Sequence, residues 1–368
     1  MRVKLSDVTK YAKGTQINRD DLIENGQYIY LNGGINPSGR WNDANVKGNT
    51  VTISEGGNSS GYVNYMTEPF WCGAHCYYLF DGPKNTRYLY YALKSQQERL
   101  FSIRSGACMP NIKKTDLGKF EFEFDTDERK QNKIVSVLSK IDAVIGERKR
   151  ELELLDELVK SRFVVMFGDV IRNSKAWQMR VFEDVAASRL GKMLDSKHQT
   201  GKYSYPYLAN FNVQWFRFNI ENLNQMDFDE DDRAEFELKD GDLLVCEGGE
   251  IGRCAVWHNE IQPCFFQKAL HRVRCNRQII HPDYLAWWFK YNCDHDGFTA
   301  IAGSKATIAH LPGIKLKQLQ VAVPPIELQE QFAAFVTQID KSKLIIQKSL
   351  DELETLNKAL MQKYFGGN

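Results

Sequence analysis

The sequence predicts an α+β fold in which two globular blocks alternate with two long helices as a pseudo-twofold internal repeat. Two long segments keep the same residues in the same register. Both segments have the three-four apolar spacing of a helix that packs on another helix. The remainder of the chain alternates short strand-like runs with Gly, Asn, Pro and Ser turns. The order is therefore block, helix, block, helix.

The repeat is seen by subtracting positions, since Asp340 minus Asp142 gives 198. Further identical pairs stand at the same spacing, namely Gln131 and Gln329, Ile141 and Ile339, Leu152 and Leu350, Leu155 and Leu353, Leu158 and Leu356, Phe167 and Phe365, and Gly168 and Gly366. Two unrelated helices would not keep such identity without a gap. We therefore infer a duplicated unit of roughly half the chain.

Each helical segment is expected to be a rod of about 60 Å, at 1.5 Å per residue, and so to need a companion helix. The residues expected at the helix–helix interface are Leu138, Ile141, Leu152, Leu155, Val336, Ile339, Leu350 and Leu353. Polar residues interrupt both apolar stripes, at Arg148, Arg162, Lys343 and Asn357. Such interruptions favour one specific pairing. A partly solvated stripe is the alternative.

The predicted domains are residues 1–125, a long helix over 126–168, residues 169–325 and a second long helix over 326–368. Strands are expected at 26–31, 50–53 and 61–65 in the first block, and at 241–247 and 254–258 in the second. The two blocks also begin alike, with Leu5-Ser6-Asp7-Val8 and Phe182-Glu183-Asp184-Val185.

Composition narrows the class of protein. A hydrophobic content of 43% and a charged content of 26% are those of a globular chain. The eight cysteines are scattered, so we expect reduced thiols and no disulfide framework. Cys72-Gly73-Ala74-His75-Cys76 suggests zinc, but a second ligand pair is lacking and a buried strand explains it as well. No apolar run is long enough for a membrane span or a signal core, which predicts a cytoplasmic protein without a membrane partner.

Several short sequence stretches resemble those of the specificity subunits of type I restriction-modification enzymes. The resemblance extends over nearly the whole chain. These stretches are Pro324-Pro325-Ile326-Glu327-Leu328-Gln329-Glu330-Gln331, the closing stretch 360–366 with Tyr364-Phe365-Gly366, and the block phrases 33–41, 57–63, 241–245 and 248–255. The first repeat departs from this pattern. Residues 125–131 lack the prolines, so the first long helix is expected to begin differently.

The resemblance implies two target-recognition domains that each read half of a bipartite site on double-stranded DNA. It also implies that the two long helices form an antiparallel coiled coil that separates them. The partners would be two DNA adenine methyltransferase subunits and a motor-nuclease restriction subunit. S-adenosylmethionine, ATP and Mg²⁺ would belong to those partners, and this chain would hold no cofactor and catalyse nothing itself.

Side chains that can read base edges, contact the backbone or stack are expected on loops of the blocks. The candidates for DNA contact are Tyr28, Arg40, Trp41, Asn42, Ser59, Tyr62, Lys202, Tyr203, Tyr205, Arg253, Gln267 and Lys305. Each could also be ordinary loop or core structure.

The charge balance argues against a free-standing DNA-binding protein, because 48 Lys and Arg stand against 47 Asp and Glu. This near-neutral charge is compatible with DNA binding if basic residues cluster on one face and partner subunits supply part of the contact with the DNA backbone. One alternative is a metal-dependent nuclease, with Asp229 or Asp231 and the Glu237-Leu238-Lys239 stretch holding Mg²⁺. A solvated acidic loop explains that run as well. Another alternative is a coiled-coil scaffold that binds no nucleic acid.

Overall fold

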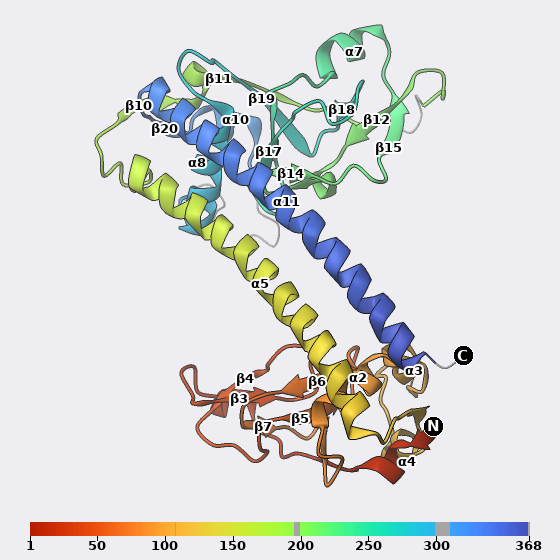
Figure 1. The fold of residues 1–368 in the computed structure, drawn as a ribbon. Coiled ribbons are helices and arrows are strands. Elements are labelled where there is room, and N and C mark those ends of the chain that lie inside the picture. The colour runs from red at the N-terminus through yellow and green to blue at the C-terminus, as the bar shows by residue number, and fades with distance from the viewer. Residues whose placement is uncertain (107, 195–198, 299–309, 367–368) are drawn as a thin grey trace. The chain divides into compact units, whose positions relative to one another are not determined.

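The computed structural model describes residues 1–106, 108–194, 199–298 and 310–366. The chain divides into two compact units. Unit 1 comprises Met1–Glu151 and Ile346–Asn368, and unit 2 comprises Leu152–Ile345. Each unit therefore contains one globular block together with part of both long helices (Figure 1). The serial division at residues 125, 168 and 325 stays a prediction.

Unit 1 combines its parts of the two long helices with a globular block built from short elements. In chain order the block has β1 (Arg2–Lys4), α1 (Leu5–Val8), β2 (Lys10–Lys13), η1 (Arg19–Asp21), β3 (Tyr28–Leu31), β4 (Gly39–Trp41), β5 (Thr50–Ser54), β6 (Val63–Met66), β7 (Phe70–Cys72), β8 (Cys76–Phe80), α2 (Thr86–Lys94), α3 (Gln97–Ser102), α4 (Lys114–Gly118) and β9 (Glu121–Glu123). The strands form sheets in the orders β2-β8-β5-β6, β4-β3-β7 and β1-β9. Within the second sheet, β3 runs parallel to β7 and antiparallel to β4.

Unit 2 has a block of the same kind with additions. Its elements are β10 (Gln178–Val181), α6 (Phe182–Val185), β11 (Ala186–Leu190), β12 (Ser204–Leu208), η3 (Asn210–Asn212), β13 (Val213–Gln214), β14 (Arg217–Phe218), β15 (Asn224–Asp227), α7 (Glu230–Phe236), β16 (Leu243–Cys246), β17 (Cys254–Val256), β18 (Phe265–Phe266), β19 (Leu270–Cys275), α8 (Pro282–Asp294), α10 (Gly313–Lys317) and β20 (Gln320–Val323). Its sheets have the orders β11-β19-β16-β17, β15-β12-β18, β10-β20 and β13-β14.

The two blocks share one topology, which confirms the α+β fold with an internal repeat. The sheet β2-β8-β5-β6 corresponds strand for strand to β11-β19-β16-β17, and β4-β3-β7 corresponds to β15-β12-β18. In the second pair of sheets, β12 is likewise parallel to β18 and antiparallel to β15. The matching starts of the blocks form the short helices α1 and α6, whose first residues Leu5 and Phe182 are fully buried. All five strands expected from the sequence are present.

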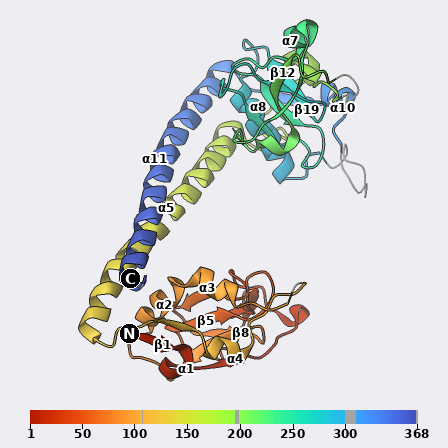
Figure 2. The same cartoon turned by 90° about the vertical axis from the view of Figure 1, so that its right-hand side faces the viewer.

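Both long helices are continuous, α5 over Glu128–Phe167 and α11 over Ile326–Phe365. They run antiparallel within each unit, as the cross-helix contacts show. In unit 1, Asn357 donates to Asp142 at 2.9 Å, and Lys149 pairs with Glu354 at 2.7 Å. In unit 2, Lys343 pairs with Asp156 at 2.6 Å. Figure 2 shows the two long helices side by side in a view turned by 90° from that of Figure 1.

The residues predicted for the helix–helix interface differ in burial, and their role in that interface stays a prediction. Leu138, Ile339 and Leu350 are buried, and the other five predicted interface residues are half-buried. The four interrupting polar residues make specific contacts: Asn357 and Lys343 bind the opposite helix, Arg148 pairs with Glu151 at 2.6 Å, and the Arg162 guanidinium lies over the Phe335 ring at 5.6 Å. The interruptions therefore add polar contacts to the helix pair.

Each block is fastened to both long helices of its unit by aromatic and aliphatic side chains. In unit 1, Ile134 and Leu138 near the start of α5 and Phe365 at the end of α11 belong to the block's core. In unit 2, Phe332 near the start of α11 and Phe167 at the end of α5 do the same. Phe365 packs on Tyr88 of α2, and Phe167 packs on Tyr284 of α8, with ring centroids 5.3 and 4.7 Å apart.

The two long helices begin differently, as the missing prolines predicted. Before α5, the Asp127 carboxylate accepts the backbone N–H of Arg129 at 2.8 Å, whereas α11 follows Pro324-Pro325 directly. A buried glutamine is common to both starts. Gln131 donates to the Asp125 carbonyl at 2.6 Å, and Gln329 donates to the Pro324 carbonyl at 2.7 Å. Gln329 also binds the segment just before α8, through the Ile279 carbonyl and the His281 N–H.

The buried amide of Gln329 yields a stability prediction. Gln329→Leu removes the partners of buried backbone groups, each of which costs about 1–3 kcal/mol when left unpaired. We expect a clear fall in the midpoint of thermal or urea unfolding. Gln131→Leu is the matched control at the repeated position, and we expect a smaller fall because the Gln131 side chain makes one hydrogen bond to the described residues against three for Gln329. Equal losses in both variants would contradict this account.

Candidate nucleic-acid interface

The β3–β4 hairpin of unit 1 holds four of the predicted contact residues. Tyr28 begins β3 opposite Trp41 of β4, and Asn42 follows as an exposed residue. The Trp41 ring meets Trp71 of β7 edge to face at 6.4 Å. Arg40 is exposed, but its guanidinium donates to the carbonyls of Gly26 at 2.5 Å and Gln27 at 2.9 Å. These bonds stabilise the hairpin and leave only part of the guanidinium fork for a ligand.

Ser59 and Tyr62 lie in the β5–β6 connection of the same unit. The Ser59 hydroxyl donates to the Gly33 carbonyl at 2.7 Å, which ties this connection to the loop after β3. The Tyr62 ring lies under the Lys94 ammonium at 3.6 Å from its centroid. Both side chains thus have structural contacts inside the unit. Their role toward DNA stays a prediction.

In unit 2 a charged turn leads into β12 and carries Lys202 and Tyr203. The turn is held by the carboxylate of Asp227 at the end of β15. That carboxylate accepts the backbone N–H groups of Thr200 at 2.5 Å, Gly201 at 2.9 Å and Tyr203 at 3.3 Å, and the Thr200 hydroxyl at 2.7 Å. These bonds, led by that of the Thr200 side chain, lower the pKa of Asp227.

A cluster of cations and aromatic rings surrounds this turn. The Lys202 ammonium lies 5.4 Å from the Tyr203 ring centroid. The Arg233 guanidinium of α7 lies 5.8 Å from the Tyr203 ring and 5.7 Å from the Tyr205 ring, and donates to the Tyr205 hydroxyl at 3.0 Å. Sequence reasoning missed Arg233 because it stands inside an acidic run. Counting helical positions from the capping residue Asp229 could have set the Arg233 side chain apart from the acidic side chains around it in the sequence.

Two of the three remaining predicted residues, Arg253 and Gln267, are tied into loop and strand contacts. The Arg253 guanidinium donates to the Asn210 carbonyl at 3.0 Å and to Glu250 at 3.1 Å, so it fixes the loop between β16 and β17. Gln267 follows β18, where its N–H binds the Leu208 carbonyl and its backbone bridges to Lys192. Lys305 lies outside the described residues.

The acidic run from Asp227 to Glu237 is used to build structure. Asp229 caps α7 by accepting the N–H of Asp232, and Asp232 pairs with the Lys192 ammonium. The backbone bond from Asp232 is the main cause that lowers the pKa of Asp229. Among the described residues no group of three or more His, Cys, Asp or Glu side chains is placed to share a metal ion. The arrangement therefore does not support the nuclease alternative.

The Cys72 and Cys76 pair ends β7 and begins β8, and both side chains are buried. His75 between them is exposed and faces Glu55 at 3.3 Å. This is the buried-strand arrangement that was the alternative to a zinc site.

In the part of the chain that the structure describes, no helix is both long enough and apolar enough to cross a membrane.

The structure groups the predicted residues on equivalent places of the two blocks. Tyr28, Arg40 and Trp41 lie on β4-β3-β7 of unit 1, whereas Tyr205 lies on β15-β12-β18 of unit 2 with Lys202 and Tyr203 just before it. Each block thus carries aromatic side chains on its three-stranded sheet, with the cation Arg40 on that sheet in unit 1 and the cations Lys202 and Arg233 beside it in unit 2. Two copies of one α+β recognition module, each built on a shared helix pair, define the class of protein.

The chain belongs to the family of type I restriction modification DNA specificity domains, whose model matches residues 1–155 and 174–355. Members of this family are the DNA-recognition components of restriction-modification systems and not the catalysts, as the sequence resemblance predicted. Membership rests on most of the chain and on both repeats.

Curated relatives agree with this assignment over part of their length. A protein of Mycoplasma genitalium provisionally named a type I specificity subunit is 35% identical over 149 residues, which are 40% of this chain and 38% of that protein. A protein of Mycoplasma pneumoniae with the same provisional description is 33% identical over 159 residues, 42% of this chain and 40% of that protein. The chain therefore matches less than half the length of either relative.

Solved structures show the same fold. The S subunit of a type I restriction-modification system from M. genitalium matches with a TM-score of 0.65 and 22% identity, over 99% of this chain and 96% of that one. A chain from a study of complex assembly and conformational transition of the type I system matches with a TM-score of 0.55 and 13% identity, over 99% and 96%.

The Asp227 carboxylate provides a test of how the unit-2 turn is built. Asp227→Asn keeps the size of the side chain but weakens its acceptance of four donors, so we expect faster hydrogen exchange at the amides of Thr200, Gly201 and Tyr203. Because the folded pKa is lowered, the wild-type protection is fully present above the ordinary pKa of Asp and is lost as pH falls through the folded value. Unchanged exchange in the variant would contradict this role.

Proposed function

We propose that this chain is a specificity subunit that reads a bipartite site on double-stranded DNA, with one half-site for each unit. The observation that supports it most directly is the repetition of one block, with aromatic side chains on the three-stranded sheet of each copy and cationic side chains on or beside that sheet. Cations on such a surface bind phosphates, and loop side chains beside them reach base edges. The loops differ between the blocks, so the two half-sites should differ in sequence.

The proposal includes the partners that the family implies. Two DNA adenine methyltransferase subunits would dock on this chain, and a motor-nuclease restriction subunit would join them. S-adenosylmethionine, ATP and Mg²⁺ would be bound by those partners. The related structure that is described in the context of complex assembly supports this view. The proposed location is the cytoplasm, as the sequence leads us to expect.

Methylation mapping tests the main proposal. Cells that carry this chain with its neighbouring methyltransferase should contain methylated adenines at one split sequence, and deletion of this chain should abolish them. Methylation without a shared split motif would overturn the bipartite reading. A scaffold that binds no DNA would give no retention of duplex DNA by the purified chain with its methyltransferase.

Lys202 offers a sharper prediction within unit 2. Its ammonium is exposed on the Asp227-held turn, where it can neutralise a phosphate. Lys202→Ala should weaken binding to all sequences and lower the slope of log affinity against log salt by about 1. Lys239→Ala, an exposed lysine of the same unit away from this turn, is the control and should change neither. Loss of preference at one base pair with an unchanged slope would assign Lys202 to base reading.

A further inference from the structure

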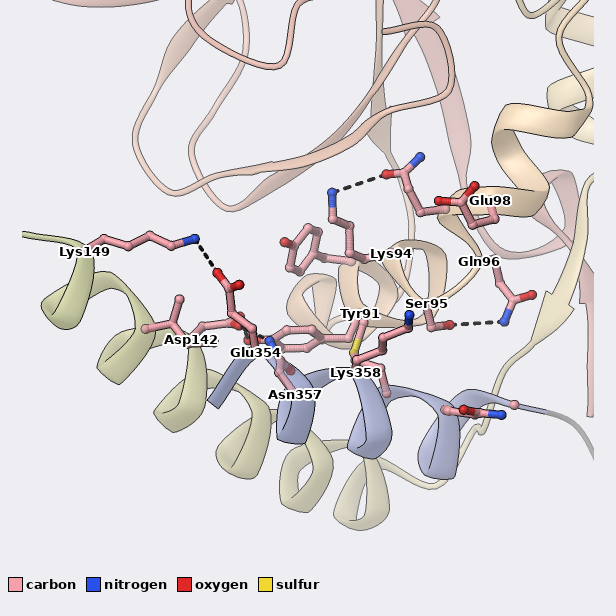
Figure 3. Close-up of a pocket in the computed structure, with 16 residues that line it drawn as sticks. Tyr91, Lys94, Ser95, Gln96, Glu98, Asp142, Lys149, Glu354, Asn357 and Lys358 are labelled. Atoms are coloured by element: carbon pink, nitrogen blue, oxygen red, sulfur yellow. Dashed lines mark hydrogen bonds and ion pairs between the residues drawn. The ribbon is translucent and has the colours of Figure 1, made fainter. Parts of the chain in front are cut away.

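Two cavities of unit 1 lie at the two ends of helix α2. Figure 3 shows the cavity at the end of α2, which has a volume of about 550 Å³. Polar groups of its wall already bind one another. Lys149 pairs with Glu354 at 2.7 Å. The Asp142 carboxylate accepts the Asn357 amide N–H at 2.9 Å. This cavity therefore indicates no particular ligand.

The cavity at the start of α2 has a volume of about 660 Å³ and is lined only by residues of unit 1. Its walls come mainly from the turn before β5, from β6, from residues 83–87 at the start of α2, and from the start of α5. Its charged lining residues are Lys84, Arg87 and Glu128. The Lys84 ammonium and the Glu128 carboxylate lie 3.6 Å apart and neutralise each other, so Arg87 provides the excess positive charge.

The guanidinium of Arg87 is positioned by a ring but has no anionic partner. It lies over the Tyr65 ring of β6, 5.0 Å from the ring centroid. Among the described residues it makes no hydrogen bond and no ion pair, and its Nε atom is buried without an acceptor. A half-buried cation without a counter-charge is costly, so an anion bound in this cavity gains affinity by neutralising it.

Two amide side chains in the wall are left as hydrogen-bond donors, because their oxygens are already occupied. Asn85 caps α2 by accepting the Tyr88 N–H at 3.0 Å, which leaves its own amide nitrogen to donate to the Asn132 oxygen at 2.9 Å. The Asn132 nitrogen then remains. In the same way the Asn49 oxygen accepts the Tyr65 hydroxyl at 3.3 Å, and the Asn49 nitrogen remains. Neither nitrogen has an acceptor among the residues that the structure describes.

Unit 2 has acidic residues at the corresponding positions. The residue before the tyrosine that packs on the end of a long helix is Arg87 in α2 and Asp283 in α8. The repeat spacing of 198 places Glu330 at the position of Asn132. Carboxylates at both positions repel an anion, so the chain has one such donor set, in unit 1.

We propose that the cavity at the start of α2 is a binding site for a phosphate group. Its unoccupied donors come from three elements, namely Asn49 before β5, Arg87 of α2 and Asn132 of α5. Such a set suits a tetrahedral anion with several acceptor oxygens better than a planar carboxylate with two. The guanidinium can bind two phosphate oxygens at once.

The phosphate belongs either to a small molecule or to the DNA backbone, and the chemistry of recognition is the same for both. None of the residues proposed above for DNA contact lines this cavity. The proposal does not depend on whether the two blocks read DNA, so its failure would leave the proposed function untouched.

The test titrates inorganic pyrophosphate into the full-length chain by isothermal titration calorimetry, in a buffer without phosphate. We expect one pyrophosphate bound per chain. Malonate, a planar dicarboxylate, is the control at the same ionic strength and should bind at least about tenfold more weakly. The titration is repeated with saturating duplex DNA: loss of pyrophosphate binding assigns the site to a backbone phosphate, and unchanged binding assigns it to a free phosphate compound.

Three variants of the chain assign the binding to this cavity. Arg87→Gln should weaken pyrophosphate binding at least about tenfold, because a charged hydrogen-bond donor is lost. Arg129→Gln removes the same charge from an exposed position of α5 outside the cavity and should change the affinity less than about twofold. Asn132→Asp still accepts from Asn85 but places a carboxylate in the wall, and should abolish binding.

Thermal unfolding of each variant shows that it is folded, and Asn132 is exposed, so its exchange leaves the core intact. Absent binding of pyrophosphate, equal binding of malonate, or binding that Arg87→Gln and Asn132→Asp leave unchanged overturns the proposal. An equal loss in Arg129→Gln and Arg87→Gln also overturns it, because the affinity would then reflect the net charge of the chain and not this cavity.

Discussion

The fold of each unit depends on one packing contact, that of a phenylalanine at the end of a long helix against a tyrosine of helix α2 in unit 1 or helix α8 in unit 2. Phe365 on Tyr88 and Phe167 on Tyr284 bring the end of one long helix to a block whose core already includes the start of the other. A buried aromatic of this size contributes about 3–5 kcal/mol by comparison with alanine. The helix pair and the block therefore form one core in each unit.

Much of this architecture could be predicted from the sequence, because the helix pair is constrained along its whole length. Phe167 and Phe365 are identical since both fill the same aromatic socket, and Gln131 and Gln329 are identical since both bind carbonyls before a long helix. The shared block topology was less visible. Short strands tolerate many apolar residues, so β5 and β16 correspond in the sheet without sharing a sequence.

The candidate interface was harder to predict, because the types of residue that read DNA also stabilise loops. Arg40, Ser59 and Arg253 all donate to backbone carbonyls of neighbouring loops, which sequence alone cannot distinguish from a free side chain. The acidic residues raise the opposite difficulty, because in the sequence they argue against a cationic surface near them. Asp227 and Asp229 hold a turn and a helix, and thereby position Lys202 and Arg233, so local negative charge supports a cationic surface instead of excluding it.

The two units differ most in a connection between strands, where the shared core constrains the sequence least. Their cores place the same sheets on the same helices, whereas the connection after the central strand of the three-stranded sheet is a short loop in unit 1 and carries a hairpin in unit 2. That addition lines a cavity of about 280 Å³ between the block and the long helices, whereas the equivalent cavity of unit 1 has about 550 Å³, even though the charges at positions 142, 354 and 358 of unit 1 recur at 340, 156 and 160 of unit 2. Duplication followed by change in one connection can therefore create a difference between two otherwise equivalent surfaces, because the helix pair continues to hold both blocks in the same local frame.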